Sequence, residues 1–447
     1  MAERPPLSAI IIFALGQFGW SLGIYSIANL MVYFYMPPDE GGVATFPAFI
    51  NQNAVFLGLT VVGLLAFGGR IFDAFIDPAI AGYSDRKKSK RGKRKSLMAM
   101  AALPFALFSF LVFYPLSTES FITNTTFLIF AVIGFYFFYT LYVIPYNALI
   151  SELGHHPDDR LKISTIISVT FALGLILGSQ VYLFQELLEA HFDSTRAFQM
   201  VIAGFSLLAF VLMLIPVLFL NENKYAKQEE QSVDTFKSLA VVFKDKNFRY
   251  FLISDAFYWL AVSFIQLGVI YYMTVLFQYE KGKASEFLAL SFVGSFVMYL
   301  LVYWLTPRLG KRILVCTGFV VFALAFLLSY FIPIMDMDKQ TIYYILIILA
   351  AFPLAVFGIL PNVIIADAVN LKESETGESQ AGMYFGVRNF LSKLGISMAN
   401  LIFPSLLIFG YTFENSAGIR YTCLAAVVFC MIGLLAFLGY KETKILN

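Results

Sequence analysis

Three ionisable side chains stand within eight positions of an otherwise apolar segment: Arg70, Asp73 and Asp77. A helix turns about 100° per residue, so these spacings place all three on one face. Each charge near the middle of a bilayer costs about 2.5–3.5 kcal/mol, so this face must meet a cavity or partner groups. Two carboxylates one turn apart repel each other, and a bound cation or proton removes that repulsion. The spacing predicts a cation or proton site; the alternative is an ion pair between Arg70 and Asp73 that joins two helices.

A further lysine stands near the middle of a second apolar segment, residues 381–410. There Asn389 and Lys393 share one stripe of a helix, and Lys393 lies about 18 Å from the helix start. A lysine at that depth needs an anionic partner, and the paired carboxylates of the first segment are the best supplier. We therefore expect Lys393, like Arg70, to respond to the charge of those carboxylates. Arg388 either faces the same cavity or extends to the lipid headgroups.

Uncharged polar side chains follow helical spacing in two more apolar segments, residues 7–35 and 122–151. Such stripes either line a cavity or hydrogen-bond a neighbouring helix, a contact worth about 0.6 kcal/mol on average. Both interpretations stay open for each single residue. The candidates for lining a substrate cavity are Gln17, Ser21, Tyr25, Tyr139, Val143, Asn147 and Asn389.

The composition places these segments in a membrane. Of the 447 residues, 59% are hydrophobic and 13% are charged, and the mean hydropathy is +0.77. An ordinary soluble domain has about 45–50% apolar and about 25% charged residues. Twelve segments are long and apolar enough to be predicted as membrane helices. They span residues 7–35, 51–82, 97–116, 122–151, 164–187, 198–220, 248–278, 286–307, 313–334, 341–370, 381–410 and 419–440.

The basic residues predict the orientation of these helices. With both termini in the cytoplasm, 23 of the 31 Lys and Arg residues fall on the cytoplasmic side and five on the outer side, as the positive-inside rule requires. A polar stretch, residues 221–247, separates six helices in residues 1–220 from six in residues 248–447. Two six-helix bundles joined by a cytoplasmic loop outline the all-α major facilitator fold. The first apolar segment lacks a small-residue cleavage site, so we expect it to be retained.

Charged residues also mark the cytoplasmic ends of several predicted helices. Asp85, Arg86, Glu152 and Asp367 are candidates for a gate in which carboxylates pair with loop arginines; solvated helix ends explain them nearly as well. The basic stretch of residues 86–95 is expected to set the topology, with contact to anionic headgroups as a secondary effect.

Other classes of function find little support. The chain has no GxxxxGK[ST] phosphate loop, so a transporter would use a gradient rather than ATP. The three cysteines stand at no metal-ligand spacing. Asp73 and Asp77 have the spacing of acidic metal clusters in some membrane transferases, but Asp158 and Asp159, the other close acidic pair in a short loop, stand beside two histidines with no third ligand. We expect no enzyme, no nucleic-acid partner and no cofactor.

Three stretches resemble the glycoside/pentoside/hexuronide:cation symporter family of the major facilitator superfamily. They are RIFDAFIDPAIAGYSD at residues 70–85, IPYNALISEL at residues 144–153, and the region from Ala366 to Lys393. The resemblance covers nearly the whole chain. The resemblance implies a cation site formed by Asp73, Asp77 and Thr140. It also implies that Arg70 and Lys393 are charged groups at the border of this site and that Tyr139 lines it.

The chain departs from this family at its sugar-binding positions. Ser21, Val143 and Asn147 stand where members like the melibiose permease have two aspartates and a tryptophan. Without these groups a buried galactoside would leave hydroxyls unpaired, at about 1–3 kcal/mol each. Ile76 replaces an asparagine between the two carboxylates, which favours H⁺ or a looser Na⁺ site.

The sequence thus predicts a secondary active transporter that couples Na⁺ or H⁺ to the symport of a small organic solute, with a sugar or glycoside as the first choice. The alternative is a lysophospholipid or another amphipathic solute, because sodium-coupled lysophospholipid symporters of the same superfamily keep the acidic pair and the lysine in an apolar cavity. The expected partners are this small-molecule substrate and membrane lipids. We expect a monomer in the cell membrane.

Overall fold

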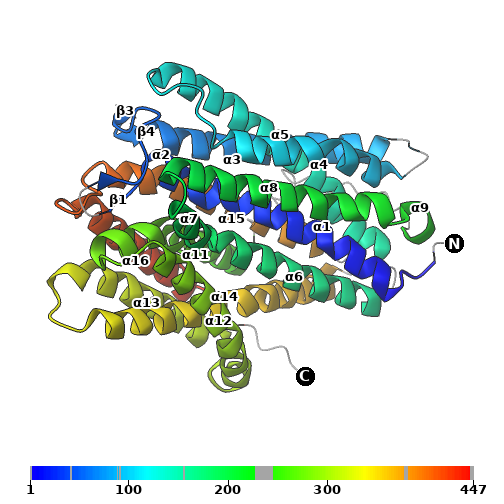
Figure 1. Cartoon of the computed structure of the whole chain (residues 1–447). Coiled ribbons are helices and arrows are strands. Elements are labelled where there is room, and N and C mark those ends of the chain that lie inside the picture. The colour runs from blue at the N-terminus through cyan, green and yellow to red at the C-terminus, as the bar shows by residue number, and fades with distance from the viewer. Residues whose placement is uncertain are drawn as a thin grey trace. The chain divides into compact units, whose positions relative to one another are not determined.

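The computed structural model describes residues 3–40, 43–87, 89, 92–154, 157–226, 245–376 and 381–442. Long helices make up most of this part of the chain (Figure 1). The chain divides into two compact units. Unit 1 comprises Met1–Pro37, Thr45–Asn53 and Leu64–Ser232, and unit 2 comprises Pro38–Ala44, Ala54–Gly63 and Val233–Asn447.

Unit 1 is a helical bundle in which α1 packs on α6 and α8, while α4 packs on α5 and α8. Small residues allow close helix contacts in such bundles: a Cβ atom on Gly19 of α1 would lie 2.7 Å from the carbonyl oxygen of Ala209 in α8. The elements are α1 (Leu7–Tyr25), the π-helical turn η1 (Ser26–Leu30), α2 (Met31–Tyr35), α3 (Val61–Arg86, whose first three residues fall in unit 2), α4 (Lys93–Leu111), α5 (Phe121–Leu153), α6 (Pro157–Ser179), α7 (Val181–Glu189), α8 (Ser194–Phe219) and the short α9 (Glu222–Tyr225).

Unit 2 is a second bundle, in which α11 packs on α15 and α16, α12 on α14, and α13 on α14 and α16. It also contains two short antiparallel hairpins. The elements are β1 (Asp39–Glu40), β2 (Val43–Ala44), β3 (Ala54–Phe56), β4 (Leu59–Thr60), α11 (Lys246–Tyr271), the π-helical turn η2 (Tyr272–Leu276), α12 (Gly282–Leu309), α13 (Lys311–Phe331), the 3₁₀ turn η3 (Ile332–Ile334), α14 (Lys339–Thr376), α15 (Ala381–Leu407) and α16 (Ala417–Leu438).

Eleven helical stretches of the described chain are long and apolar enough to cross a membrane. The helix α3, with 26 residues, is also long enough, but its apolar stretch contains Arg70, Asp73 and Asp77. Each of the twelve predicted segments overlaps one of the eleven stretches or α3. Large apolar side chains stand exposed on the long helices, such as Leu300, which is 74% exposed. Such faces suit lipid rather than water, so the chain is an all-α, multi-pass membrane protein.

Several helix boundaries differ from the sequence prediction. The segment 51–82 was predicted as one helix, but residues 54–60 form the β3–β4 hairpin and the helix begins only at Val61. The turn explains the difference, because Leu57 (φ 47°) and Gly58 (φ 80°) both adopt left-handed conformations that tight hairpins require. The helix α4 begins at Lys93 instead of residue 97, so residues 93–95 of the basic stretch belong to this helix. The predicted central loop, residues 221–247, contains α9, and its residues 227–244 lie outside the described chain.

Candidate cation site and substrate region

The carboxylate of Asp73 is the centre of a buried polar cluster in unit 1. Asp73 has no exposed surface, and Thr140 of α5 donates a hydrogen bond of 2.6 Å from its hydroxyl to Oδ1. The guanidinium of Arg70 lies 3.8 Å from Oδ2, on the same helix face. The predicted neighbours Arg70 and Thr140 therefore both lie against Asp73. A cationic group and a hydroxyl thus lie against this buried carboxylate, as the cost of burying a charge requires.

The position of Arg70 is fixed by aromatic residues of α5. Its guanidinium carbon lies 5.5 Å from the ring centroid of Tyr136, within cation–π distance. The close approach of α3 to α5 depends on Gly69, because a Cβ atom there would lie 2.4 Å from a ring carbon of Tyr136 and 2.7 Å from Val132. Because residue 69 is a glycine, α3 lies close enough to α5 for Thr140 to hydrogen-bond Asp73.

The second carboxylate, Asp77, is half-buried one turn further along α3. Pro78 follows inside the helix, and because proline has no N–H, the carbonyl of Ala74 loses its helical hydrogen-bond donor. The segment between the two carboxylates thus offers a backbone oxygen besides Asp73, Asp77 and Thr140. Oxygen donors of this kind suit Na⁺ or a proton rather than a soft metal. Within the described residues no group of three or more His, Cys, Asp or Glu side chains could hold a metal ion.

The predicted cavity residues differ in burial and in what they contact. Ser21 and Tyr25 are buried where α1 meets α6: an added Cβ on Gly174 would lie 1.9 Å from Ser21 Oγ, and one on Gly178 would lie 2.6 Å from the ring of Tyr25. Ser21 donates to the carbonyl of Phe18 in its own helix. Both side chains thus contribute to the packing of α1 on α6, and the hydroxyl of Tyr25 bonds no residue of the described chain. Gln17, Tyr139 and Val143 are buried, whereas Asn147 and Asn389 are exposed.

Trp20 of α1 is a residue that the sequence analysis missed. Its ring meets Tyr139 edge to face at 5.9 Å and Phe171 at 5.7 Å. It is buried, and its indole nitrogen Nε1 bonds no residue of the described chain. A buried indole N–H usually finds an acceptor, so this donor is suited to a ligand oxygen. The rarity of tryptophan, with three in the chain, was the available signal.

Unit 2 contains a buried ion pair of its own. Arg388 of α15 donates from Nε and from a terminal nitrogen to the two carboxylate oxygens of Asp255 in α11, at 3.0 and 3.2 Å. Ser392 adds a hydrogen bond of 3.3 Å to the same carboxylate. Arg388 therefore faces the inside of its bundle and does not extend to the headgroups. Lys393 is half-buried on the next position of α15 and belongs to a different unit from Asp73, so their pairing stays a prediction.

The candidate gate residues of unit 1 meet on Arg94. This buried side chain donates to Glu152 of α5 at 2.7 and 3.0 Å, to Asp85 of α3 at 2.7 Å and to Ser84 at 2.6 Å. Arg86, the arginine predicted for this role, is exposed and donates to the carbonyl of Gly82 in its own helix. Arg94 makes these contacts instead, because α4 already begins at Lys93 and carries the side chain inward.

A carboxylate of the short helix α9, just beyond α8, caps the start of α4. Glu222 accepts hydrogen bonds from the backbone N–H groups of Arg94 (3.1 Å) and Lys95 (2.8 Å). Gly92 precedes them with φ 99°, and a Cβ atom there would lie 2.2 Å from the Glu222 carboxylate. The side chain of Lys95 in turn donates to the carbonyl of Leu220 at the end of α8.

Unit 2 repeats this arrangement at the start of α13. The tripeptide Gly-Lys-Arg occurs at residues 92–94 and again at 310–312. Gly310 has φ 82°, and Glu442 accepts the backbone N–H groups of Lys311 and Arg312. The side chain of Arg312 donates to the carbonyl of Leu438 at the end of α16. The described residues thus contain two copies of one helix cap.

The repeat also places the remaining gate candidate. Asp367 of α14 pairs with the ammonium of Lys311, as Glu152 pairs with Arg94 in unit 1. The two pairs lie in separate units. The repeated Gly-Lys-Arg marks both helix starts, but the side chain that pairs is its arginine in unit 1 and its lysine in unit 2.

The fold and the buried charges define a multi-pass membrane transporter. The family of MFS/sugar transport proteins matches residues 13–441, and the chain belongs to this family. It is 24% identical to the isoprimeverose transporter of Lactiplantibacillus pentosus over 98% of this chain and 90% of that protein. It is 20% identical to the sodium-dependent lysophosphatidylcholine symporter 1 of Xenopus tropicalis over 84% of this chain and 79% of that protein. The crystal structure of the nucleoside transporter NupG shares the fold, with a TM-score of 0.67 at 13% identity over 98% of this chain and 99% of that one.

The contact between α3 and α5 yields a first prediction. Gly69→Ala should lower the free energy of unfolding by about 1–3 kcal/mol, because the added methyl group displaces Tyr136. Gly68→Ala is the matched control, since an added Cβ there meets nothing within 4 Å. Thermal unfolding of the purified variants in detergent measures the difference. Equal midpoints for the two variants would contradict the close approach.

The cap on α4 yields a prediction about pH. Burial raises the pKa of Glu222, although the N–H groups of Lys95 and Arg94 oppose this. A raised pKa in the folded state contributes stability that is full below the ordinary carboxyl value of about 4.3 and is lost as the pH rises through the raised value. The unfolding midpoint of the wild type should therefore fall over this pH range more steeply than that of Glu222→Gln. Glu119→Gln, on an exposed loop, should keep the wild-type slope; parallel curves for all three would refute the assignment.

Proposed function

We propose that this protein is a secondary active symporter that couples the entry of Na⁺ or H⁺ to the transport of a small sugar or glycoside. The observation that carries the proposal is the buried contact of Asp73 with Arg70 and Thr140. A purely structural membrane protein gains nothing from three charges on one face of a helix, each of which is costly to insert. A coupled transporter needs such a group, because its charge must change during the cycle.

The cluster couples ion binding to transport because the bound ion neutralises the net negative charge of the two carboxylates. With Asp73 and Asp77 ionised, Arg70 compensates only one negative charge, so a cation or proton is attracted to the oxygen set that includes Thr140. Once the ion is bound, the site is close to neutral and can cross the apolar barrier at lower cost. We propose that Lys393 of unit 2 competes with the ion for the same carboxylates.

The neighbouring aromatic residues support a sugar as the solute. Trp20 offers a flat apolar ring and an N–H donor beside Tyr139, and Gln17 lies one turn before it on α1. Aromatic rings with a polar edge bind the apolar faces of sugars while donating to their hydroxyls. The name of the isoprimeverose transporter, which the chain resembles over nearly its whole length, adds support from a relative.

A lysophospholipid is the second candidate solute. It is favoured by the relative whose name is sodium-dependent lysophosphatidylcholine symporter 1 and by the buried aromatic groups around Trp20. Counterflow in proteoliposomes with a panel of pentosides, hexosides and lysophospholipids separates the candidates. If only lysophospholipids support counterflow, the transported solute is a lysophospholipid and not a sugar.

The wider mechanism follows the major facilitator scheme. We propose that residues 1–220 and 248–447 act as two bundles that rock around the bound solute and are linked by residues 221–247. Both termini lie in the cytoplasm. The protein acts as a monomer in the plasma membrane. The acid–base pairs Arg94–Glu152 and Lys311–Asp367 then mark the cytoplasmic ends of the bundles and serve as gate elements. The relatives are transporters, and we propose no enzymatic step and no cofactor besides the coupling ion.

The coupling role of Asp73 can be tested by one substitution. Asp73→Asn should abolish accumulation of solute above the external concentration, because a neutral amide no longer changes charge with the ion, while the protein still inserts. Asp336→Asn, on an exposed loop, is the control of matched chemistry. Uptake in membrane vesicles, with a protonophore or with Na⁺ replaced, measures the effect and identifies the ion. Wild-type accumulation by Asp73→Asn would refute the assignment.

The donor role of Trp20 can be tested separately from coupling. Trp20→Phe keeps an aromatic ring and removes the N–H, so the KM for the sugar should rise about fivefold, the effect of one lost hydrogen bond. The dependence on the ion gradient should stay as in the wild type. Trp304→Phe is the control, because this side chain is 57% exposed and lies in unit 2. An unchanged KM for Trp20→Phe would exclude a contact between the indole and the solute.

A further inference from the structure

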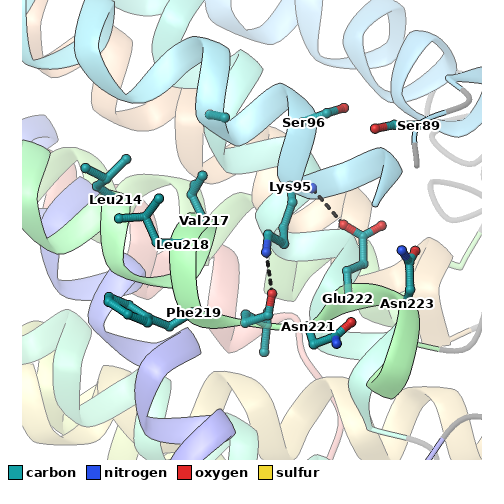
Figure 2. A pocket seen from close by; sticks show the side chains of 12 residues that line it. Ser89, Lys95, Ser96, Leu214, Val217, Leu218, Phe219, Asn221, Glu222 and Asn223 are labelled. Carbon is teal, nitrogen blue, oxygen red and sulfur yellow. Dashed lines mark hydrogen bonds between the residues drawn. The ribbon is translucent and has the colours of Figure 1, made fainter. Parts of the chain in front are cut away.

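A groove outside the proposed transport site runs between the start of α4 and the end of α8. It has a volume of about 790 Å³, which is the size of a site for an organic molecule rather than for a single ion or water. Figure 2 shows its lining: apolar side chains of α8 gather on one side of Lys95, and polar side chains of residues 221–223 gather on the other. The groove is thus amphipathic along its length.

The apolar side of the groove belongs to the last turns of α8. Leu214, Val217, Leu218 and Phe219 line it, and Leu218 and Phe219 are 61% and 68% exposed. The stretch Ser194–Phe219 is one of the helices that can cross a membrane, so this wall lies near the end of a membrane span. Exposed apolar side chains at such a place face acyl chains.

The polar side of the groove begins at Lys95. A hydrogen bond of 2.5 Å to the carbonyl of Leu220 fixes its ammonium at the end of α8 (Figure 2), where the apolar wall ends. Ser89, Ser96, Asn221 and Asn223 add neutral polar groups around it. Lys95 also lies in the basic stretch of residues 86–95. A lysine at the end of a membrane span, with hydroxyl and amide groups around it, is suited to a phosphate at the depth of the headgroups.

The carboxylate of Glu222 also lines the groove. It points to the start of α4, where it accepts the backbone N–H groups of Arg94 and Lys95. Its partners therefore lie in the protein rather than in the groove.

We propose that this groove binds one acidic glycerophospholipid, with its phosphate at Lys95 and an acyl chain along Leu214, Leu218 and Phe219. The lipid occupies a place distinct from the cluster around Asp73, so the inference does not depend on the transported solute. It ties the starting turn of α4, and with it Arg94, to the composition of the surrounding membrane.

Native mass spectrometry of the purified full chain tests the proposal. The protein is titrated with phosphatidylglycerol and, separately, with phosphatidylcholine of the same acyl chains. The wild type should retain phosphatidylglycerol in preference, and Lys95→Gln should lower that preference about fivefold, the effect of one basic residue at an anionic surface. Ala99→Trp, which fills the groove without a change of charge, should reduce binding of the lipid as well.

Arg312→Gln is the matched control, because Arg312 makes the same type of hydrogen bond to the end of the last helix of unit 2. It should keep the wild-type preference for phosphatidylglycerol. Three results would overturn the proposal: an unchanged preference in Lys95→Gln, an equal loss in Arg312→Gln, or displacement of the lipid by inorganic phosphate, which would indicate an anion site without an acyl chain. A thermal midpoint equal to that of the wild type verifies that each variant is folded.

Discussion

A charge buried in a membrane bundle must find its partners inside that bundle, and the structure of this protein depends on that constraint. In unit 1 the constraint is met by Arg70 and Thr140 around Asp73, at a place where Gly69 lets α3 approach α5. In unit 2 it is met by the paired hydrogen bonds of Arg388 to Asp255. The two solutions differ in one respect: Asp73 is followed one turn later by a second, half-buried carboxylate. This surplus of negative charge is what makes unit 1 the proposed site of the coupling ion.

The same constraint explains the repeated caps at the helix ends. The first N–H groups of α4 and α13 have no partners within their helices, and each helix begins after a glycine with positive φ that leaves room for a carboxylate. Glu222 and Glu442 fill these places from beyond α8 and α16. Each cap thereby links the start of one helix to the end of another within its unit, which holds Arg94 and Lys311 in position for their acidic partners.

The sequence predicted much of the fold because membrane helices leave a strong signal in hydropathy, and it predicted the neighbours of Asp73 through helical spacing and family resemblance. Spacing did not determine which partner each side chain meets. Ser21 follows the same stripe as Gln17, yet its contact with Gly174 depends on how closely α6 approaches. Arg94 was expected in a loop. It is buried because α4 begins at Lys93, and this helix start is capped by the carboxylate of Glu222, which lies more than a hundred residues away in the sequence. Long-range contacts of this kind have no local signal.

The most direct test of the central claim is the stoichiometry between ion and solute. In proteoliposomes with a fixed solute gradient, the membrane potential and the ion gradient can be varied until net solute flux stops. If the cluster around Asp73 exchanges its ion in every cycle, the point of zero flux must shift with the ion gradient, at a fixed number of ions per solute. A point of zero flux that depends on the solute gradient alone would contradict the account, because solute would then move without the buried charge changing its partner.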